Sequence, residues 1–124
     1  VHEVEVTIST LKQDFLNKAF DAFVAIKNNE VVGMALYYPV YSTWKGKSIH
    51  LEDLVVKQSE RRKGIGKMLF DVLVNEAKKL KAGRLQWQVL DWNKSAIAFY
   101  KNYPAQFDGE WINVKITNQE LQNI

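Results

Sequence analysis

Apolar residues recur at steps of three and four in three stretches of the chain, and each stretch is predicted to form an amphipathic helix. The first begins with capping-box spacing at 10–13 and ends near Lys18. The second is the longest. It begins after a pair of glycines, of which Gly64 is the first, and Gly83 is placed to end it. The third begins at Asn93, a residue type that suits a helix N-cap.

Between the helices the apolar period is two, which predicts β-strands at 23–27, 31–38, 48–56, 85–89 and 111–117. The first two strands are predicted to form a hairpin around the turn 28–30. Alternation in the third strand places Asp53 on the face of Ile49 and Leu51, and Glu52 on the opposite face. This order of elements predicts an α/β (α+β) fold with helices packed on a mixed sheet. Because no repeat, low-complexity tract or linker interrupts the chain, residues 1–124 are expected to form a single domain.

Composition limits the kinds of metal site and active site that the chain can contain. The chain has 124 residues, of which 47% are apolar and 25% charged, so it can bury a core without disulfides or metals. It contains no cysteine, which excludes disulfide frameworks, cysteine–zinc sites, iron–sulfur clusters and cysteine nucleophiles. The two histidines, His2 and His50, leave little room for a histidine-rich metal site or a Ser-His-Asp triad. We therefore expect no metal, and most hydrolase mechanisms are removed.

The chain is mildly basic, and a small anionic ligand is enough to explain its charge balance. Basic residues exceed acidic residues by 17 to 14, a formal net charge of +3, which is less than a dedicated nucleic-acid binder carries. The longest apolar stretch, 31–41, contains Gly33 and Pro39 and is too short for a transmembrane helix. The N-terminal sequence lacks the features of a signal peptide. The expectation is a cytoplasmic protein without nucleic-acid or membrane partners.

The sequence between the third strand and the long helix is suited to binding phosphate. A helix N-terminus offers unpaired amides and a partial positive charge, glycines allow close approach, and basic side chains complement the anion. The residues in question are Arg61, Arg62, Lys63, Gly64, Ile65, Gly66 and Lys67. A Rossmann fingerprint would need glycine in place of Leu69, and a P-loop would need Ser or Thr in place of Met68. The alternative is a glycine turn that merely starts a helix beneath a solvated basic segment.

The spacing Arg-x-x-Gly-x-Gly between a strand and a long helix resembles the coenzyme A signature of the GNAT N-acetyltransferases. Further segments occur in the order and spacing of one subgroup, the diamine (spermidine/spermine) N-acetyltransferases and their thialysine-acetylating relatives. These segments are Tyr37-Tyr38, Trp44-Lys45-Gly46-Lys47, Leu51-Glu52-Asp53, Asp91-Trp92-Asn93 and Phe99-Tyr100-Lys101. The resemblance covers roughly residues 20–117.

The resemblance implies a mixed, mostly antiparallel sheet flanked by helices, without the strand and helix with which family members usually begin. Arg62 and Lys63 depart from the family pattern, since residues there are usually small or apolar, and they should strengthen phosphate contact. The implied activity is acetyl transfer from acetyl-CoA to a primary amine of a small substrate, either a di- or polyamine or an amino-acid-like amine, by a homodimer. The alternatives are a peptide or protein N-acetyltransferase and a non-catalytic coenzyme A-binding module.

The chemistry of the implied reaction assigns candidate residues. An alkyl amine with a pKa of about 10.4 is almost fully protonated at neutral pH, so a base is needed, and the resemblance favours Glu52. Tyr100 is implied as the acid that protonates the leaving thiolate, with Phe99 a packing residue. The backbone amides of Leu54, Val55 and Val56 could stabilise the thioester carbonyl and pair with the coenzyme arm. The resemblance adds Asn93, Ala96 and Tyr100 to the cofactor site, and Trp44, Asp53, Asp91 and Trp92, with Glu52, to the amine site.

Overall fold

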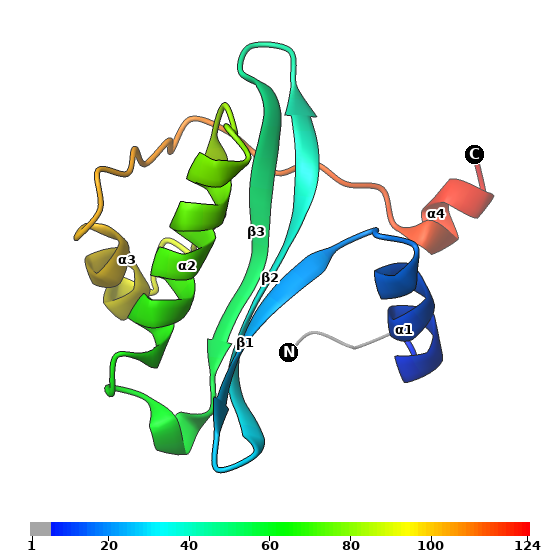
Figure 1. Ribbon diagram of the computed structural model, residues 1–124. Coiled ribbons are helices and arrows are strands. Elements are labelled where there is room, and N and C mark those ends of the chain that lie inside the picture. The colour runs from blue at the N-terminus through cyan, green and yellow to red at the C-terminus, as the bar shows by residue number, and fades with distance from the viewer. Residues whose placement is uncertain (1–5) are drawn as a thin grey trace. The chain divides into compact units, whose positions relative to one another are not determined.

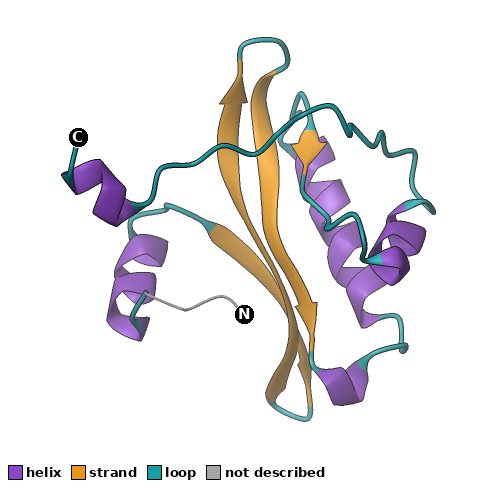
Figure 2. Ribbon diagram, turned by 180° about the vertical axis from the view of Figure 1, so that it is seen from behind, coloured by secondary structure: helices purple, strands orange, loops and turns teal. Residues whose placement is uncertain are grey.

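The computed structural model describes residues 6–124, so His2 and most of the N-terminal sequence considered above lie outside the described residues. The chain divides into two compact units, one reaching Gln88 and the other spanning Val89–Ile124. The first unit contains α1 (Ile8–Leu16), β1 (Asp21–Lys27), β2 (Glu30–Ser42), β3 (Gly46–Val56), the short 3₁₀ helix η1 (Gln58–Glu60), α2 (Ile65–Lys79) and β4 (Leu85–Gln86) (Figures 1 and 2). The second contains α3 (Lys94–Tyr100) and α4 (Asn118–Gln122).

The four strands form one sheet in the order β1-β2-β3-β4. The β1–β2 and β2–β3 pairs are antiparallel, and β4 joins β3 in parallel, which confirms the predicted mixed, mostly antiparallel sheet. The β1–β2 turn has Asn28 at φ 51° and Asn29 at φ 63°. Asparagine tolerates this left-handed conformation, and two such residues suit a tight hairpin, so the predicted turn is confirmed.

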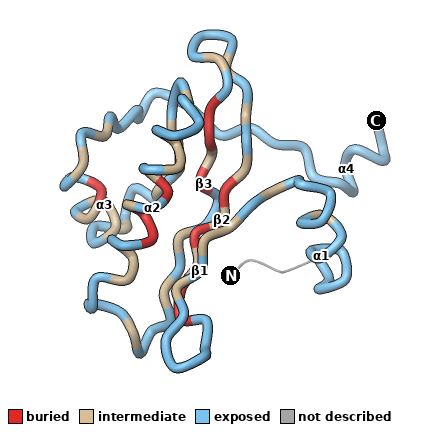
Figure 3. The backbone as a smooth tube through the Cα atoms, viewed as in Figure 1, coloured by how far each residue is buried: buried red, intermediate tan, exposed pale blue. Residues whose placement is uncertain are grey.

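Helix α2 contacts β1, β2 and β3 and supplies much of the core. Phe70 and Leu73 are fully buried, and the Phe70 ring lies edge-on to Trp87, with 5.1 Å between ring centroids. Burying one such side chain stabilises the fold by about 1.5–3 kcal/mol. The buried residues of α2, β2 and β3 are coloured red in Figure 3. Gly33 lets the helix approach closely, because a Cβ there would lie 3.0 Å from Leu69 Cδ1 and 3.2 Å from Ile65 Cγ2.

The face alternation predicted for β3 is wrong beyond Leu51. Leu51 pairs with Tyr37 and Asp53 pairs with Leu36, so Glu52 is an extra residue, a β-bulge. The bulge shifts the period by one. Leu54, three residues after Leu51, therefore shares the α2 face with it, while Asp53 and Val55 are exposed. Glu52 and Asp53 thus both leave the core face, in contrast to the predicted opposite faces.

Gly83 does not end α2, contrary to prediction. The left-handed residue after the helix is Lys81, at φ 55°, and the amides of Lys81 and Ala82 bond to the carbonyls of Lys78 and Ala77 in a Schellman motif. Gly83 is required for another reason. A Cβ at this position would overlap the backbone of Lys45, so only glycine fits beside the β2–β3 turn.

Three other predicted elements differ in their limits or do not form. Helix α1 begins at Ile8 and is capped by Thr7, so the predicted cap at residue 10 is wrong. β4 has two residues instead of the predicted five, 85–89. No strand forms at 111–117, where apolar side chains such as Trp111 and Val114 are exposed, and α4 follows instead. Alternation alone does not make a strand where no neighbouring strand pairs with it.

In the second unit, α3 begins where predicted. Asn93 is its N-cap, and Asn93 Oδ1 accepts a hydrogen bond from the Ala96 amide at 3.2 Å. Within residues 6–124, none of the helices has the length and apolar character needed to span a membrane. The same residues bring no three His, Cys, Asp or Glu side chains together as a metal site would require.

Candidate active site

The end of β3 leads through η1 into an uncapped helix N-terminus. Gly64 precedes the first helical residue with φ 83°, and no side chain caps this end of α2. The first amides of an α-helix have no partner inside the helix, and the helix dipole adds a partial positive charge there. The helix therefore begins at the glycine turn as predicted, and its free amides could receive an anion.

The two glycines of the turn meet different constraints. Gly64 adopts a left-handed conformation that other residues reach only with strain. Gly66 has no such constraint, because a Cβ there would meet only Val56 Cγ2, at an ordinary 3.7 Å. Packing within the described chain therefore does not demand glycine at 66.

The basic residues of the turn are not equally available to a ligand. The Arg61 Nε donates to Val56 O at 3.0 Å, which ties the turn back to β3. Lys63 pairs with Glu60 at 3.3 Å, and Lys67 pairs with Asp71 at 2.6 Å, one helical turn on. Of the described residues, none forms a hydrogen bond or ion pair with Arg62. Arg62 lies within the turn and has a left-handed backbone conformation, with φ 64°.

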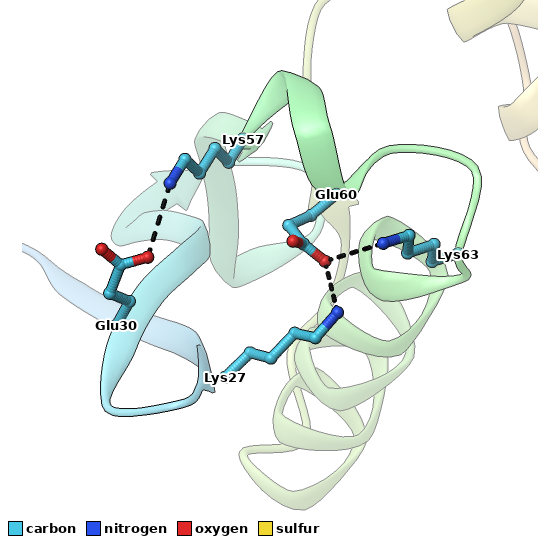
Figure 4. A network of polar contacts seen from close by, with 5 residues as sticks. All are labelled: Lys27, Glu30, Lys57, Glu60 and Lys63. Atoms are coloured by element: carbon cyan, nitrogen blue, oxygen red, sulfur yellow. Dashed lines mark hydrogen bonds and ion pairs between the residues drawn. The ribbon is translucent and has the colours of Figure 1, made fainter.

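A network of ion pairs joins the β1–β2 hairpin to η1 (Figure 4). Glu60 Oε1 accepts from Lys27 Nζ at 2.8 Å and from Lys63 Nζ at 3.3 Å, and Lys57 lies 3.4 Å from Glu30. The hydrogen bond from Lys27 is the main cause that lowers the pKa of Glu60, and the bond to Glu60 raises the pKa of Lys27. The network holds the turn in position before the helix begins.

β3 has a free edge beyond its short pairing with β4. That pairing involves only Ile49 and His50 of β3. From Leu51 to Val56, within the described part of the chain, the edge away from β2 has no strand partner. Because strand amides alternate between the two edges, every second amide in 54–56 points to this side. The amides of 54–56 that point to this side have no strand partner in the described chain, and their predicted contact with a ligand stays a prediction.

Glu52, at the bulge, is hydrogen-bonded to one side chain and lies near a second. The Tyr38 hydroxyl donates to Glu52 Oε1 at 3.0 Å, and His50 Nε2 lies 3.7 Å from the same oxygen. The Tyr38 and His50 rings are 5.2 Å apart. The Glu52 side chain is 51% exposed, so it remains open to solvent or substrate. Burial, followed by the hydrogen bond to Glu52, raises the pKa of Tyr38 and keeps the phenol a donor.

Asp53 lies beside Glu52 and feels its charge. Partial burial and, secondly, the charge of Glu52 raise the pKa of Asp53. Two neighbouring carboxylates make this region of β3 an attractive site for a cationic amine.

Tyr37 and Trp44, both aromatic, lie in contrasting environments. Tyr37 is a core residue stacked on Phe23, with its pKa raised to about 12, chiefly by burial. Trp44 is 91% exposed in the β2–β3 turn. Glu52 is six residues beyond the start of β3, so Trp44 lies roughly 20 Å along the hairpin from Glu52 at about 3.4 Å per residue. Within the chain, the structure does not bring these two candidate substrate residues together.

The remaining candidates belong to the second unit. Tyr100 is the buried residue of α3, at 8% exposure, and burial raises its pKa, so the phenol stays protonated at neutral pH. Phe99 is half-buried and contacts the Tyr100 and Tyr103 rings. Phe99 therefore packs as expected, but Tyr100 packs as well, and the expectation that it is not a packing residue is wrong. Trp92 is 70% exposed, and Asp91 is also exposed.

The profile of the Acetyltransferase (GNAT) family matches residues 2–103, most of the chain. The chain belongs to the GNAT acetyltransferase family. This confirms the family resemblance that the glycine turn and its flanking segments had suggested.

Three curated relatives are acetyltransferases. A thialysine N-epsilon-acetyltransferase from Caenorhabditis elegans is 44% identical over 94 residues, covering 76% of this GNAT chain and 59% of the relative. An L-ornithine N5-acetyltransferase from Arabidopsis thaliana is 38% identical, with 84% and 47% covered. A thialysine N-epsilon-acetyltransferase from Mus musculus is 30% identical, with 99% and 80% covered. The chain thus spans about half the length of the first two relatives.

Solved structures share the fold. An integron cassette protein from the mobile metagenome of V.cholerae has a TM-score of 0.77 at 26% identity, covering 90% of this chain and 76% of the other. An aminoglycoside acetyltransferase from an uncultured soil metagenomic sample has a TM-score of 0.79 at 22% identity, covering 94% and 78%, and shows the fold alone.

Sequence reasoning missed the partners of Glu52. Tyr38 was noted only as part of a motif, and His50 only as one of two histidines. The hairpin register, in which Tyr38 pairs with His50, is the signal that could have placed both beside Glu52. The register follows directly from the β2–β3 turn, but the bulge just beyond it, which sets the position of Glu52, was not revealed by the apolar pattern.

Proposed function

We propose that this GNAT chain transfers an acetyl group from acetyl-CoA to the primary amine of a small, amino-acid-like substrate. The observation that carries the proposal is that two features lie close together along the chain. Glu52 lies at a bulge of β3, and the uncapped N-terminus of α2, which begins after Gly64, follows that strand. The first supplies a carboxylate, and the second an anion site. Both elements are needed to bring a charged coenzyme and an ammonium substrate to the same strand.

The residues of the turn fit coenzyme A. Its pyrophosphate is an anion that the α2 amides and the unpaired Arg62 would hold, and the absence of a Cβ at Gly66 leaves room for it. Arg61, bonded to Val56 O, would keep the turn against the strand. Acetyl-CoA supplies a thioester as acyl donor, and amides on the free edge of 54–56 would bind its carbonyl and its arm.

Glu52 is the proposed base. The substrate arrives as an ammonium ion and must lose a proton before its nitrogen can attack. Glu52 attracts that ion and accepts the proton directly or through water, and Asp53 adds negative charge. Tyr38 holds one Glu52 oxygen by a 3.0 Å hydrogen bond, which fixes the carboxylate.

Tyr100 is the proposed acid. Its burial raises its pKa, so the phenol carries a proton at neutral pH that it can donate to the departing thiolate. Asn93 is occupied as the cap of α3, and its Oδ1 bonds to the Ala96 amide. A contact of Asn93 or Ala96 with the coenzyme arm would use atoms other than the Asn93 Oδ1 and the Ala96 amide, which bond to each other.

The proposed amine class rests on the named relatives. Thialysine and L-ornithine are amino acids that end in a primary amine, and relatives acting on them cover most of this chain. Polyamines remain within the proposal because they offer the same alkyl amine. Resemblance to the diamine acetyltransferases further supports a cytoplasmic homodimer.

Release of free thiol from acetyl-CoA tests the proposal when thialysine, L-ornithine, spermidine and a lysine peptide are supplied in turn. We expect release with one or more of the small amines and little with the peptide. Preference for the peptide would overturn the substrate class. Binding of acetyl-CoA with no thiol release from any amine would make the chain a coenzyme A-binding module.

A further inference from the structure

His50 is linked to the next strand by two side-chain hydrogen bonds. Arg84 Nε donates to Gln86 Oε1 at 3.0 Å, and Gln86 Nε2 lies 3.2 Å from His50 Nδ1. A guanidinium can only donate, so the glutamine atom that faces it must be the oxygen. The amide nitrogen is then left facing His50, and it too can only donate. His50 Nδ1 must therefore be an acceptor.

The proton of the neutral imidazole is consequently on Nε2, the atom that faces Glu52 Oε1 at 3.7 Å. The His50 side chain is 16% exposed, so its orientation is fixed by its neighbours. The charged or titratable groups that face it are Tyr38 on β2, Glu52 on its own strand, and Arg84 through Gln86 on the β4 side.

We propose that His50, set in its Nε2–H tautomer by Gln86 and Arg84, is a positioning residue for Glu52. This rests on the proposed role of Glu52 as the base. Tyr38 and His50 both address Oε1. Among the described residues, none forms a hydrogen bond or ion pair with Oε2. Tyr38 holds Oε1 by a hydrogen bond and the His50 N–H faces the same oxygen at 3.7 Å, which leaves Oε2 available to a substrate ammonium.

The two hydrogen bonds depend on this tautomer. A proton on Nδ1 would face the amide of Gln86, donor against donor, so Gln86 would have to turn its oxygen to the ring and lose its bond to Arg84. The Nε2–H tautomer keeps both bonds and directs an N–H dipole at Glu52 Oε1.

Nitrogen NMR of the imidazole tests the tautomer without any activity measurement. In protein labelled with ¹⁵N, the two histidines are told apart by the loss of one signal set in His50→Gln. We expect the His50 Nε2–H tautomer at neutral pH, and its loss in Gln86→Glu, which keeps the shape of the side chain but offers an acceptor to Nδ1. A wild-type Nδ1–H tautomer would overturn the proposal.

Activity against pH tests the positioning role. Gln86→Glu should lower kcat/KM roughly tenfold at pH 7 and little near pH 10, where the amine loses its proton unaided. Gln13→Glu makes the same change on the exposed surface of α1 and serves as the control. His50→Phe should lose a similar factor, while His50→Gln, which retains an N–H at the position of Nε2, should recover most of it. Equal losses at all pH values, or no recovery in His50→Gln, would overturn the proposal.

Glu52→Gln separates this inference from the proposed function. If Glu52→Gln shows the pH-dependent loss and the His50 and Gln86 variants do not, only the positioning role fails. If Glu52→Gln itself shows no such loss, Glu52 is not the base, and both proposals fail together.

Discussion

The two functional regions on and just beyond β3 are built in contrasting ways. The turn at Gly64 is made by the backbone: the unpaired amides of α2, a left-handed glycine and a missing Cβ at Gly66 form the proposed anion site. The second region, here called the Glu52 cluster, is made by side chains from three strands: Tyr38 from β2, His50 and Glu52 from β3, and Gln86 from β4.

This difference separates binding from proton transfer. A backbone site depends on local conformation and space, so a single added methyl group can close it without disturbing the fold. A side-chain site depends on register and partners, so its function is altered by exchanging one polar atom for another. The two regions should therefore fail independently, each with its own kinetic signature.

The largest expected effect is that of Glu52→Gln, which removes the proposed base and keeps the shape of the side chain. We expect kcat/KM to fall by roughly 10² to 10³ at pH 7 and to recover strongly toward pH 9–10, as the amine deprotonates unaided. Steady-state rates across this pH range measure it, and Glu110→Gln is the surface control. A loss that is uniform across pH would mean that Glu52 only positions the substrate.

Tyr100→Phe should lower turnover by roughly 10², the usual scale for losing a general acid. In contrast to Glu52→Gln, raising the pH should not recover the rate, because deprotonating the amine does not help the thiolate to leave. An acyl donor with a more acidic thiol should recover part of it. Since Tyr100 is buried, thermal melts are the necessary companion measurement. A fall in Tm large enough to account for the lost rate would assign Tyr100 to packing.

Gly66→Ala tests the backbone region. We expect KM for acetyl-CoA to rise roughly tenfold while the pH profile stays unchanged, because the new methyl occupies the approach to the helix amides. The methyl meets Val56 at 3.7 Å and alanine favours helix, so Tm should hold or rise. Gly109→Ala, whose Cβ meets nothing within 4 Å, is the matched control. An unchanged KM would remove the ligand from this turn.

Glu60→Gln weakens the support of the turn. The pKa of Glu60 is lowered in the folded chain, chiefly by Lys27, so its stabilising effect is present above the ordinary glutamate range and is lost as pH falls through it. We therefore expect a Tm a few degrees lower than wild type at pH 7, with the two curves meeting below about pH 4. A difference that persists in acid would indicate lost packing instead of lost ion pairs.

The smallest expected effect is that of Asp53→Asn, which should raise Tm slightly at pH 7. The pKa of Asp53 is raised by burial and by the charge of Glu52, so its ionised form costs stability above the ordinary aspartate range. The gain should shrink as pH falls toward 4, where the carboxylate takes up its proton. A Tm that falls at pH 7 would show that the charge is stabilising.

The glycine turn before α2 could be predicted from the sequence, and the Glu52 cluster only in part. Gly64, Gly66 and the apolar period of α2 are contiguous, so local rules sufficed for the helix start. Glu52 was found by family resemblance, but its neighbours depend on how β2 pairs with β3. The bulge at Glu52 moves Asp53 off the face that alternation gave it, and no local signal marked it.

The remaining errors have the same cause. Gly83 looks like a helix stop by position, but its role is set by Lys45, distant in sequence. Residues 111–117 alternate as a strand does, yet no described strand pairs with them. Tyr100 and Phe99 are adjacent on one helix, and only tertiary packing decides which one is buried. Local sequence patterns predict helices and turns, whereas contacts between residues distant in sequence decide strand pairing and which side chains are buried.

Calorimetric titration of coenzyme A into wild type, Gly66→Ala and Glu52→Gln tests most directly whether the two regions divide the work. We predict that Gly66→Ala raises the Kd for coenzyme A roughly tenfold, while Glu52→Gln leaves it unchanged within a factor of about two. If both variants weaken binding equally, or if Glu52→Gln alone weakens it, the division between a backbone binding site and a side-chain proton acceptor is contradicted.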